Sequence, residues 1–220
     1  FRAALAAAGI PGRGAAAAGA TAMTAAIRRA HATARAAGVA WPEVDIEKIW
    51  RTTLAALQES GLAPAKVPAG KIRRAAVEFE GRINPVWPMP GFPECLTPLR
   101  EQGLRLGIVS NAQFFTPLLF PALTGRELPE MGFDPEACAW SFQHGIAKPA
   151  PELFQAALHP LRKKYGIRPA CVLAVGNDRL NDVAAAAACG CRTALFAGDA
   201  RSLRRREDDE RCAGVKPDWI

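Results

Sequence analysis

The strongest constraint on the fold is an alternation of short apolar runs with helical segments that begins at Glu94. The apolar runs span 104–110, 137–142, 170–176 and 192–198, and the helical segments span 94–103, 151–166 and 182–190. Strands that are apolar on both sides are typical of a parallel sheet whose two faces are covered by helices. The sequence therefore predicts a doubly wound α/β domain, with Pro160 kinking or dividing the helix at 151–166.

The residues before this alternation carry a helical pattern instead. The segment 45–61 repeats its apolar residues every three or four positions, with Asp45 as the expected N-cap and Gly61 closing the helix. A further helix is expected earlier in the chain, at 22–38. The proline-dense stretch at 83–93 lies at the end of the helical region and cannot continue a helix. We therefore expect a helical domain at residues 1–88 and an α/β domain at 89–220.

Charge and composition narrow the class of partner. The net charge is +7, but the densest basic run, 201–211, is interrupted by four acids, so we expect a solvated surface and no nucleic-acid partner. An anionic small substrate is compatible with this charge. No apolar run approaches the roughly 20 residues of a membrane helix, and the six cysteines lack the spacing of a zinc site. We expect a cytoplasmic protein with free thiols and no membrane partner.

Polar residues stand where the predicted strands end or in the loops that follow, and ligands of such sheets bind outside the carboxyl ends of the strands. They are Ser110, Asn111, Lys148, Asn177, Asp178 and Asp182. Taken singly, each has an ordinary interpretation as a turn, a loop lysine or a helix cap. Taken together, the hydroxyl and the lysine could bind a phosphate group. The carboxylates would repel that phosphate, and a bound Mg²⁺ would offset the repulsion. The sequence predicts a phosphate and magnesium site at this edge.

Three segments in this order resemble the motifs of the haloacid dehalogenase superfamily of aspartate-nucleophile phosphatases and their relatives. They are "LGIVSN" with Ser110, "AKP" with Lys148, and "VGNDRLND" with Asp178 and Asp182, and the resemblance extends from about Pro88 to the end. It implies a helical cap and a Mg²⁺-dependent phosphatase that acts on a small phosphorylated substrate through an aspartyl-phosphate. Ser110 would hold a phosphoryl oxygen, Lys148 would offset negative charge and orient the nucleophile, and the two acids would position Mg²⁺.

The chain departs from the family's pattern at two places. Asn177 follows Gly176 where the family has an acid, so either Asn177 takes that place or the acid has moved to Asp178. We favour Asp178 and Asp182 as the metal-site carboxylates, with Asn177 beside them through its side-chain oxygen. The second departure is that nothing matches the family's first motif, DxDxT, which supplies the nucleophile.

The missing first motif has a structural consequence. The family's first strand lies between the strands of the second and fourth motifs, so without it two rows of backbone groups would lack partners and the sheet should not close. We therefore expect that a segment of the natural protein lies outside these 220 residues at each end, and no nucleophile is named.

Two other functions stay open. One is a 2-haloacid dehalogenase, which needs no metal, and the other is a non-catalytic binding protein that keeps the fold without the nucleophile. His144 is the best remaining candidate for a minor role in the site. A monomer and a homodimer are equally compatible with the sequence.

Overall fold

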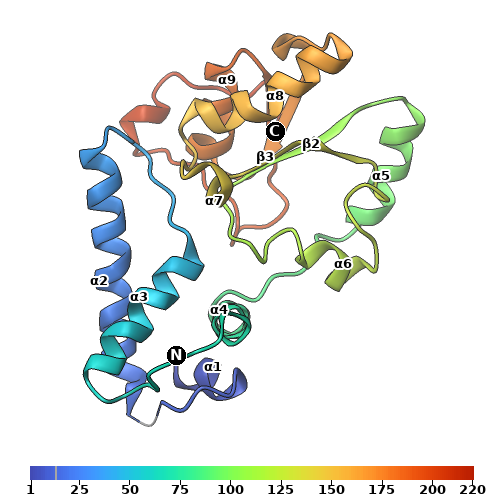
Figure 1. Ribbon diagram of the computed structural model, residues 1–220. Coiled ribbons are helices and arrows are strands. Elements are labelled where there is room, and N and C mark those ends of the chain that lie inside the picture. Colours follow the sequence, from blue (N-terminus) through green and yellow to red (C-terminus); the bar gives the residue numbers. More distant parts are fainter. Residues whose placement is uncertain (13) are drawn as a thin grey trace. The chain divides into compact units, whose positions relative to one another are not determined.

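A computed structural model describes residues 1–12 and 14–220, which form two compact units (Figure 1). The helical unit comprises Phe1–Trp87 together with Gln113–Phe115, and the α/β unit comprises Pro88–Ala112 and Thr116–Ile220. Within the described residues, no helix combines the length and the apolar character needed to cross a bilayer.

The helical unit is built from α1 (Arg2–Ala7), α2 (Ala15–Ala36), α3 (Ile46–Glu59) and α4 (Ala69–Ile83). Asp45 is the N-cap of α3, as predicted, because its carboxylate accepts hydrogen bonds from the backbone N–H groups of Glu47 and Lys48. Trp50 on α3 is fully buried and stacks on Phe1, with ring centroids 4.9 Å apart. The helix expected at 22–38 begins earlier, at Ala15, because the preceding alanine-rich residues also favour helix.

The α/β unit confirms the predicted fold class. Its helices are α5 (Phe92–Glu101), α6 (Leu119–Thr124), α7 (Ser141–His144), α8 (Pro151–Tyr165) and α9 (Ala185–Ala188). Its strands are β1 (Leu106–Ser110), β2 (Phe133–Trp140), β3 (Leu173–Gly176) and β4 (Arg192–Leu195). A π-helical turn (Arg179–Ala184) leads into α9, and two 3₁₀ turns lie at Pro169–Cys171 and Glu210–Cys212.

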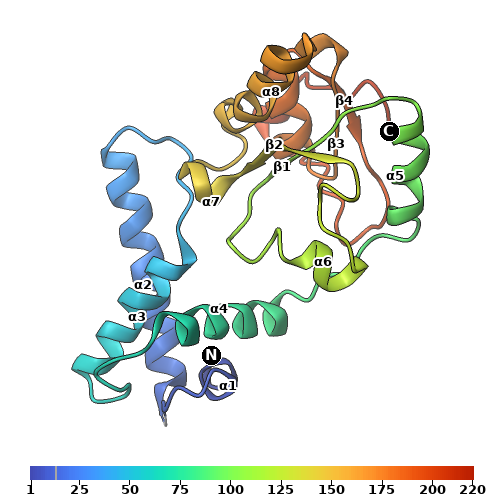
Figure 2. The same ribbon diagram turned by 45° about the vertical axis from the view of Figure 1, so that its right-hand side comes forward.

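The four strands form two parallel pairs (Figure 2). β1 pairs with β2, and β3 pairs with β4, in separate two-stranded sheets. This division agrees with the expectation that a sheet without its central strand does not close. Two apolar side chains on β3, Leu173 and Val175, are 50% and 62% exposed, although β3 was expected to be buried. An isolated parallel bridge joins Trp219 to Ala194 of β4.

One helix packs on residues from both strand pairs. Phe154 and Leu158 of α8 belong to a cluster that includes Val109 of β1 and Ala174 of β3. We expected Pro160 to kink or divide this helix, and α8 is one helix from Pro151 to Tyr165, so the proline does not divide it. Buried leucines on α8 before and after the proline hold the helix against the core and compensate for the hydrogen bond that proline removes. This packing brings the carboxyl ends of β1 and β3 within reach of the same side chains.

Candidate functional site

Lys148 connects the carboxyl ends of the two strand pairs. It lies in the loop before α8, and its ammonium donates to the carbonyl oxygen of Val109 at 2.9 Å and to Oδ1 of Asp182 at 2.6 Å. Val109 belongs to β1, and Asp182 lies in the π-helical turn after β3. The lysine side chain is 11% exposed and that of Asp182 12%, so Lys148 is not an ordinary solvated loop lysine. The Coulomb attraction between two shielded charges is larger than that between two exposed charges at the same distance.

Asn111 fixes the backbone of that lysine from one side. Its Oδ1 accepts a hydrogen bond from the Lys148 backbone N–H at 2.7 Å, and its Nδ2 donates to the Lys148 carbonyl oxygen at 3.2 Å. The amide therefore imitates the donor and acceptor of a neighbouring strand. Sequence reasoning placed Asn111 among the candidate catalytic residues, and its contacts are those of a group that positions Lys148.

Asp182 fills the space beside the last residue of β3. Its Oδ2 accepts a hydrogen bond from the Asp178 backbone N–H at 2.9 Å, opposite the oxygen that faces Lys148. A Cβ atom added to Gly176 would overlap the side chain of Asp182. Gly176 therefore permits the close approach of the carboxylate to the strand end.

Asp178 faces other partners. Its Oδ1 caps the following turn by accepting from the N–H groups of Leu180 and Asn181, and both of its oxygens contact Arg206, at 3.2 and 2.6 Å. Burial alone would raise the pKa of Asp178, but the Arg206 guanidinium and the two N–H groups outweigh it and hold the pKa below the ordinary value. The assignment of Asp178 as a metal ligand stays a prediction, and these contacts do not favour it.

Asn177 and Ser110 lie at strand ends with more modest contacts. The Asn177 amide Nδ2 donates to the Ser202 carbonyl at 2.6 Å. Ser110 ends β1, and its hydroxyl has a long, 3.4 Å contact with the Asn111 carbonyl. Among the described residues, no hydrogen bond joins Ser110 directly to Lys148 or Asp182. Its place directly after Val109, whose carbonyl holds the lysine, is what associates it with the site. His144 is exposed at the end of α7.

The segment Asp199–Arg206, which we call the strap, also contacts the candidate site and was not predicted to do so. Besides the Asn177–Ser202 and Asp178–Arg206 contacts, the Arg204 N–H donates to the Asn177 carbonyl at 2.8 Å. The Arg179 N–H in turn donates to the Arg204 carbonyl at 2.9 Å. The charge pattern of 201–211 predicted a solvated surface and carried no signal of this pairing, which depends on contacts between distant segments.

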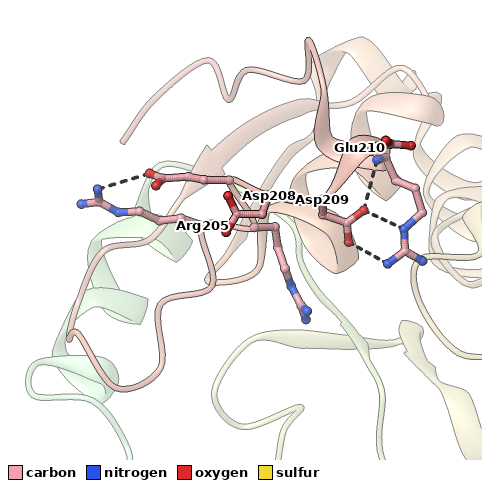
Figure 3. Close-up of a pocket in the computed structure, with 7 residues that line it drawn as sticks. Arg205, Asp208, Asp209 and Glu210 are labelled. Carbon is pink, nitrogen blue, oxygen red and sulfur yellow. Dashed lines mark hydrogen bonds and ion pairs between the residues drawn. The ribbon is translucent and has the colours of Figure 1, made fainter.

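The residues from Arg205 to Arg211, which include the end of the strap, fit the original expectation of a solvated surface better. An open hollow in the surface is lined by Arg205–Arg211, and charged side chains of opposite sign pair along it (Figure 3). Arg211 contacts Asp209 at 2.7 Å, and Arg205 contacts Glu207 at 3.6 Å with both side chains 68% exposed. Pairs this exposed contribute little to stability. Arg206 therefore differs from its neighbours because its guanidinium is directed at the partly buried Asp178.

The described residues offer a partial set of ligands for Mg²⁺. In residues 1–12 and 14–220, no three histidine, cysteine or acidic side chains come together in a way that could enclose a metal ion. Mg²⁺ nevertheless needs only one or two protein carboxylates and keeps several water ligands. Asp182 fits that requirement as a carboxylate at the strand end, and Asn177 is a neighbouring amide. Both acids already have partners: Asp182 contacts Lys148 and the Asp178 N–H, and Asp178 contacts Arg206 through both of its oxygens.

A comparison with protein families shows which family the chain belongs to. A model of the haloacid dehalogenase-like hydrolases matches residues 4–190. The chain belongs to this family. A comparison with curated proteins finds no match. The family match extends across most of the chain, including the residues before Pro88 to which the motif resemblance did not reach.

Solved structures show similarity of fold. A predicted phosphoglycolate phosphatase from Haemophilus somnus 129PT is 20% identical, with a TM-score of 0.50 and coverage of 82% of this chain and 74% of that one. A HAD phosphatase from Thermococcus onnurineus is 24% identical, with a TM-score of 0.45. The alignment covers 59% of this chain and about half, 51%, of the Thermococcus chain. A 2-haloacid dehalogenase from Pseudomonas syringae pv. tomato DC3000 is 23% identical, with a TM-score of 0.46 and coverage of 69% and 60%.

Proposed function

We propose that this haloacid dehalogenase-like protein is a Mg²⁺-dependent phosphatase that acts on a small phosphorylated metabolite through an aspartyl-phosphate. The observation that carries the proposal is the contact of the Lys148 ammonium with both Asp182 and the Val109 carbonyl. A cation held at the carboxyl ends of parallel strands, beside a serine hydroxyl and a carboxylate, suits the binding of a phosphoryl group. The helical unit is proposed to serve as the cap domain.

Each side chain has a definite task in this proposal. The Ser110 hydroxyl donates to a phosphoryl oxygen, and the Lys148 ammonium offsets the negative charge that develops during transfer. Asn111 keeps the Lys148 backbone in place through its two hydrogen bonds. Asp182 would hold Mg²⁺ with Asn177 nearby, and the bound ion would supply neutralisation of phosphate charge. Covalent transfer to an aspartate divides one difficult step into two easier ones.

The proposal requires a nucleophilic aspartate, and no strand of the described residues ends in the family's DxD pattern. We propose that this aspartate stands on a strand between β1 and β3. The separation of the two strand pairs supports this proposal. A strand placed there would satisfy backbone groups on both sides.

The first test is hydrolysis of an aryl phosphate by the full-length protein. Mg²⁺-dependent turnover should fall at least about tenfold in Asp182→Asn and further in Lys148→Met, because each change removes one charge of the pair, and tenfold corresponds to about 1.4 kcal/mol in barrier. Lys163→Met, which removes an exposed lysine of α8, should leave turnover unchanged.

Three results would contradict the proposal. Unchanged turnover in a folded Asp182→Asn variant would reject its role in the site. Halide release from a 2-haloacid in the absence of Mg²⁺ would favour the dehalogenase instead. Absence of both activities, in a full-length protein whose strand between β1 and β3 carries no aspartate, would favour a binding protein.

A further inference from the structure

Asp182 in the π-helical turn and Asp178, the N-cap of that turn, each contact a different basic side chain. Asp182 contacts Lys148 at 2.6 Å, and Asp178 contacts Arg206 at 2.6 Å through Nη2 and at 3.2 Å through Nε. The Arg206–Asp178 contact is bidentate, which fixes the plane of the carboxylate as well as its position. Asp178 in turn caps the turn that carries Asp182, and its own N–H donates to Asp182 at 2.9 Å. A continuous chain of contacts thus runs from the strap to the site lysine.

We propose that Arg206 is a positioning residue for the candidate site, which acts by holding Asp178 as the cap of the turn so that Asp182 is the carboxylate presented to Lys148. The expected effect of Arg206 on turnover rests on the proposed function. Its expected effect on the order of the turn rests on the geometry alone. It also assigns the two acids different tasks: Asp178 orders the turn, and Asp182 serves the chemistry.

The geometry distinguishes this role from that of an ordinary surface arginine. The side chain of Asp178 is 11% exposed, whereas Glu207, the partner of the adjacent Arg205, is 68% exposed. Loss of a guanidinium from a shielded, bidentate carboxylate leaves a charge without its partner, while loss of one from an exposed pair has little effect. Arg205 is therefore a matched control: it is the neighbouring residue, has the same charge and lies in the same segment.

The structural test is amide hydrogen exchange in the full-length protein. Arg206→Met should accelerate exchange of the Leu180 and Asn181 amides by about tenfold, because the Asp178 carboxylate oxygen that accepts from both is released, whereas Arg205→Met should not. In an Asp178→Ser background, which keeps a capping oxygen but no charge, Arg206→Met should add nothing. Unchanged exchange in Arg206→Met would overturn the inference. Equal acceleration throughout α8 would do so as well, because it would indicate general destabilisation.

The functional test separates positioning from folding. At temperatures well below unfolding, Arg206→Met should lower kcat for an aryl phosphate about tenfold and weaken the apparent affinity for Mg²⁺, with KM changed less than about twofold. Arg206→Lys should recover part of the loss, since lysine restores the charge without the bidentate geometry. A normal kcat with a lowered melting temperature would overturn the role. If the wild-type protein lacks turnover, the proposed function fails, and the exchange experiment still decides the inference.

Discussion

At the scale of single residues, the site depends on side chains that hold other side chains. Lys148 is near Asp182 because its own backbone is held by Asn111 and its ammonium by the Val109 carbonyl. Three of these contacts use backbone groups, namely the N–H and carbonyl of Lys148 and the carbonyl of Val109. The network therefore combines backbone contacts with one ion pair.

The Asn111 contacts lead to a prediction. Asn111→Ala removes two hydrogen bonds to the Lys148 backbone, and we expect it to lower the free energy of unfolding by about 1 kcal/mol and turnover of an aryl phosphate by about tenfold. Urea titration and steady-state kinetics measure the two effects. Asn84→Ala, which removes an exposed contact with Glu80, is the control and should change neither. Wild-type kcat in Asn111→Ala would show that the amide does not position the lysine.

At the scale of elements, α8 is joined to the strands by polar contacts as well as by its apolar face. The Tyr165 hydroxyl at its end donates to Asp134 of β2 at 2.7 Å, and Lys164 approaches the same carboxylate at 3.6 Å. The hydrogen bond from Tyr165, with that from the Glu136 N–H and the nearby positive charge of Lys164, holds the pKa of Asp134 below its ordinary value despite burial. The end of α8 is thus tied to the start of β2, at the opposite end of the helix from Lys148.

The lowered pKa of Asp134 gives a pH dependence with a definite sign. A carboxyl whose folded-state pKa is depressed stabilises the fold above its unfolded pKa, and this contribution is lost as pH falls through the folded value. Asp134→Asn should therefore cost about 1 kcal/mol of unfolding free energy at about pH 7 and less at about pH 2. Glu136→Gln, whose side chain is 63% exposed, should cost little at either pH. Urea titrations at both pH values measure this, and a cost that does not depend on pH would contradict the assignment.

At the scale of the whole molecule, each unit has a core of its own. Leu54 and Leu57, 2% exposed, lie with Trp50 in the core of the helical unit. Leu153, 1% exposed, lies in a second core together with Ala139 of β2. The two units are also interleaved in sequence, since Gln113–Phe115 belong to the helical unit although the residues on either side belong to the α/β unit.

Separate cores predict separate responses to cavity-forming substitutions. Leu54→Ala should destabilise the helical unit by about 3 kcal/mol and Leu153→Ala the α/β unit by a similar amount, as expected for buried leucines. Hydrogen exchange resolved by segment should show each loss of protection confined to the unit that contains the substitution. Uniform loss of protection across both units in either variant would indicate one cooperative fold.

Local patterns were sufficient for part of this structure. The cap at Asp45 and the end of β1 at Ser110 were predicted because capping and strand termination depend on neighbouring residues. The start of β2 at Phe133 was missed because Asp134 and Pro135 are not typical strand residues. These residues become part of a strand because β2 pairs with β1. The strap was missed for the same reason: its charges show no preference for the acidic turn until the chain folds.

The close approach at Gly176 links two positions that differ completely in chemistry. The carboxylate of Asp182 occupies the volume in which a side chain at position 176 would stand. Replacement of a glycine by alanine in a strand is ordinarily among the mildest of changes, yet here a single methyl group would displace the carboxylate from its place beside the lysine. Tolerance to substitution at position 176 should therefore be as narrow as at position 182, although the glycine brings no functional group of its own.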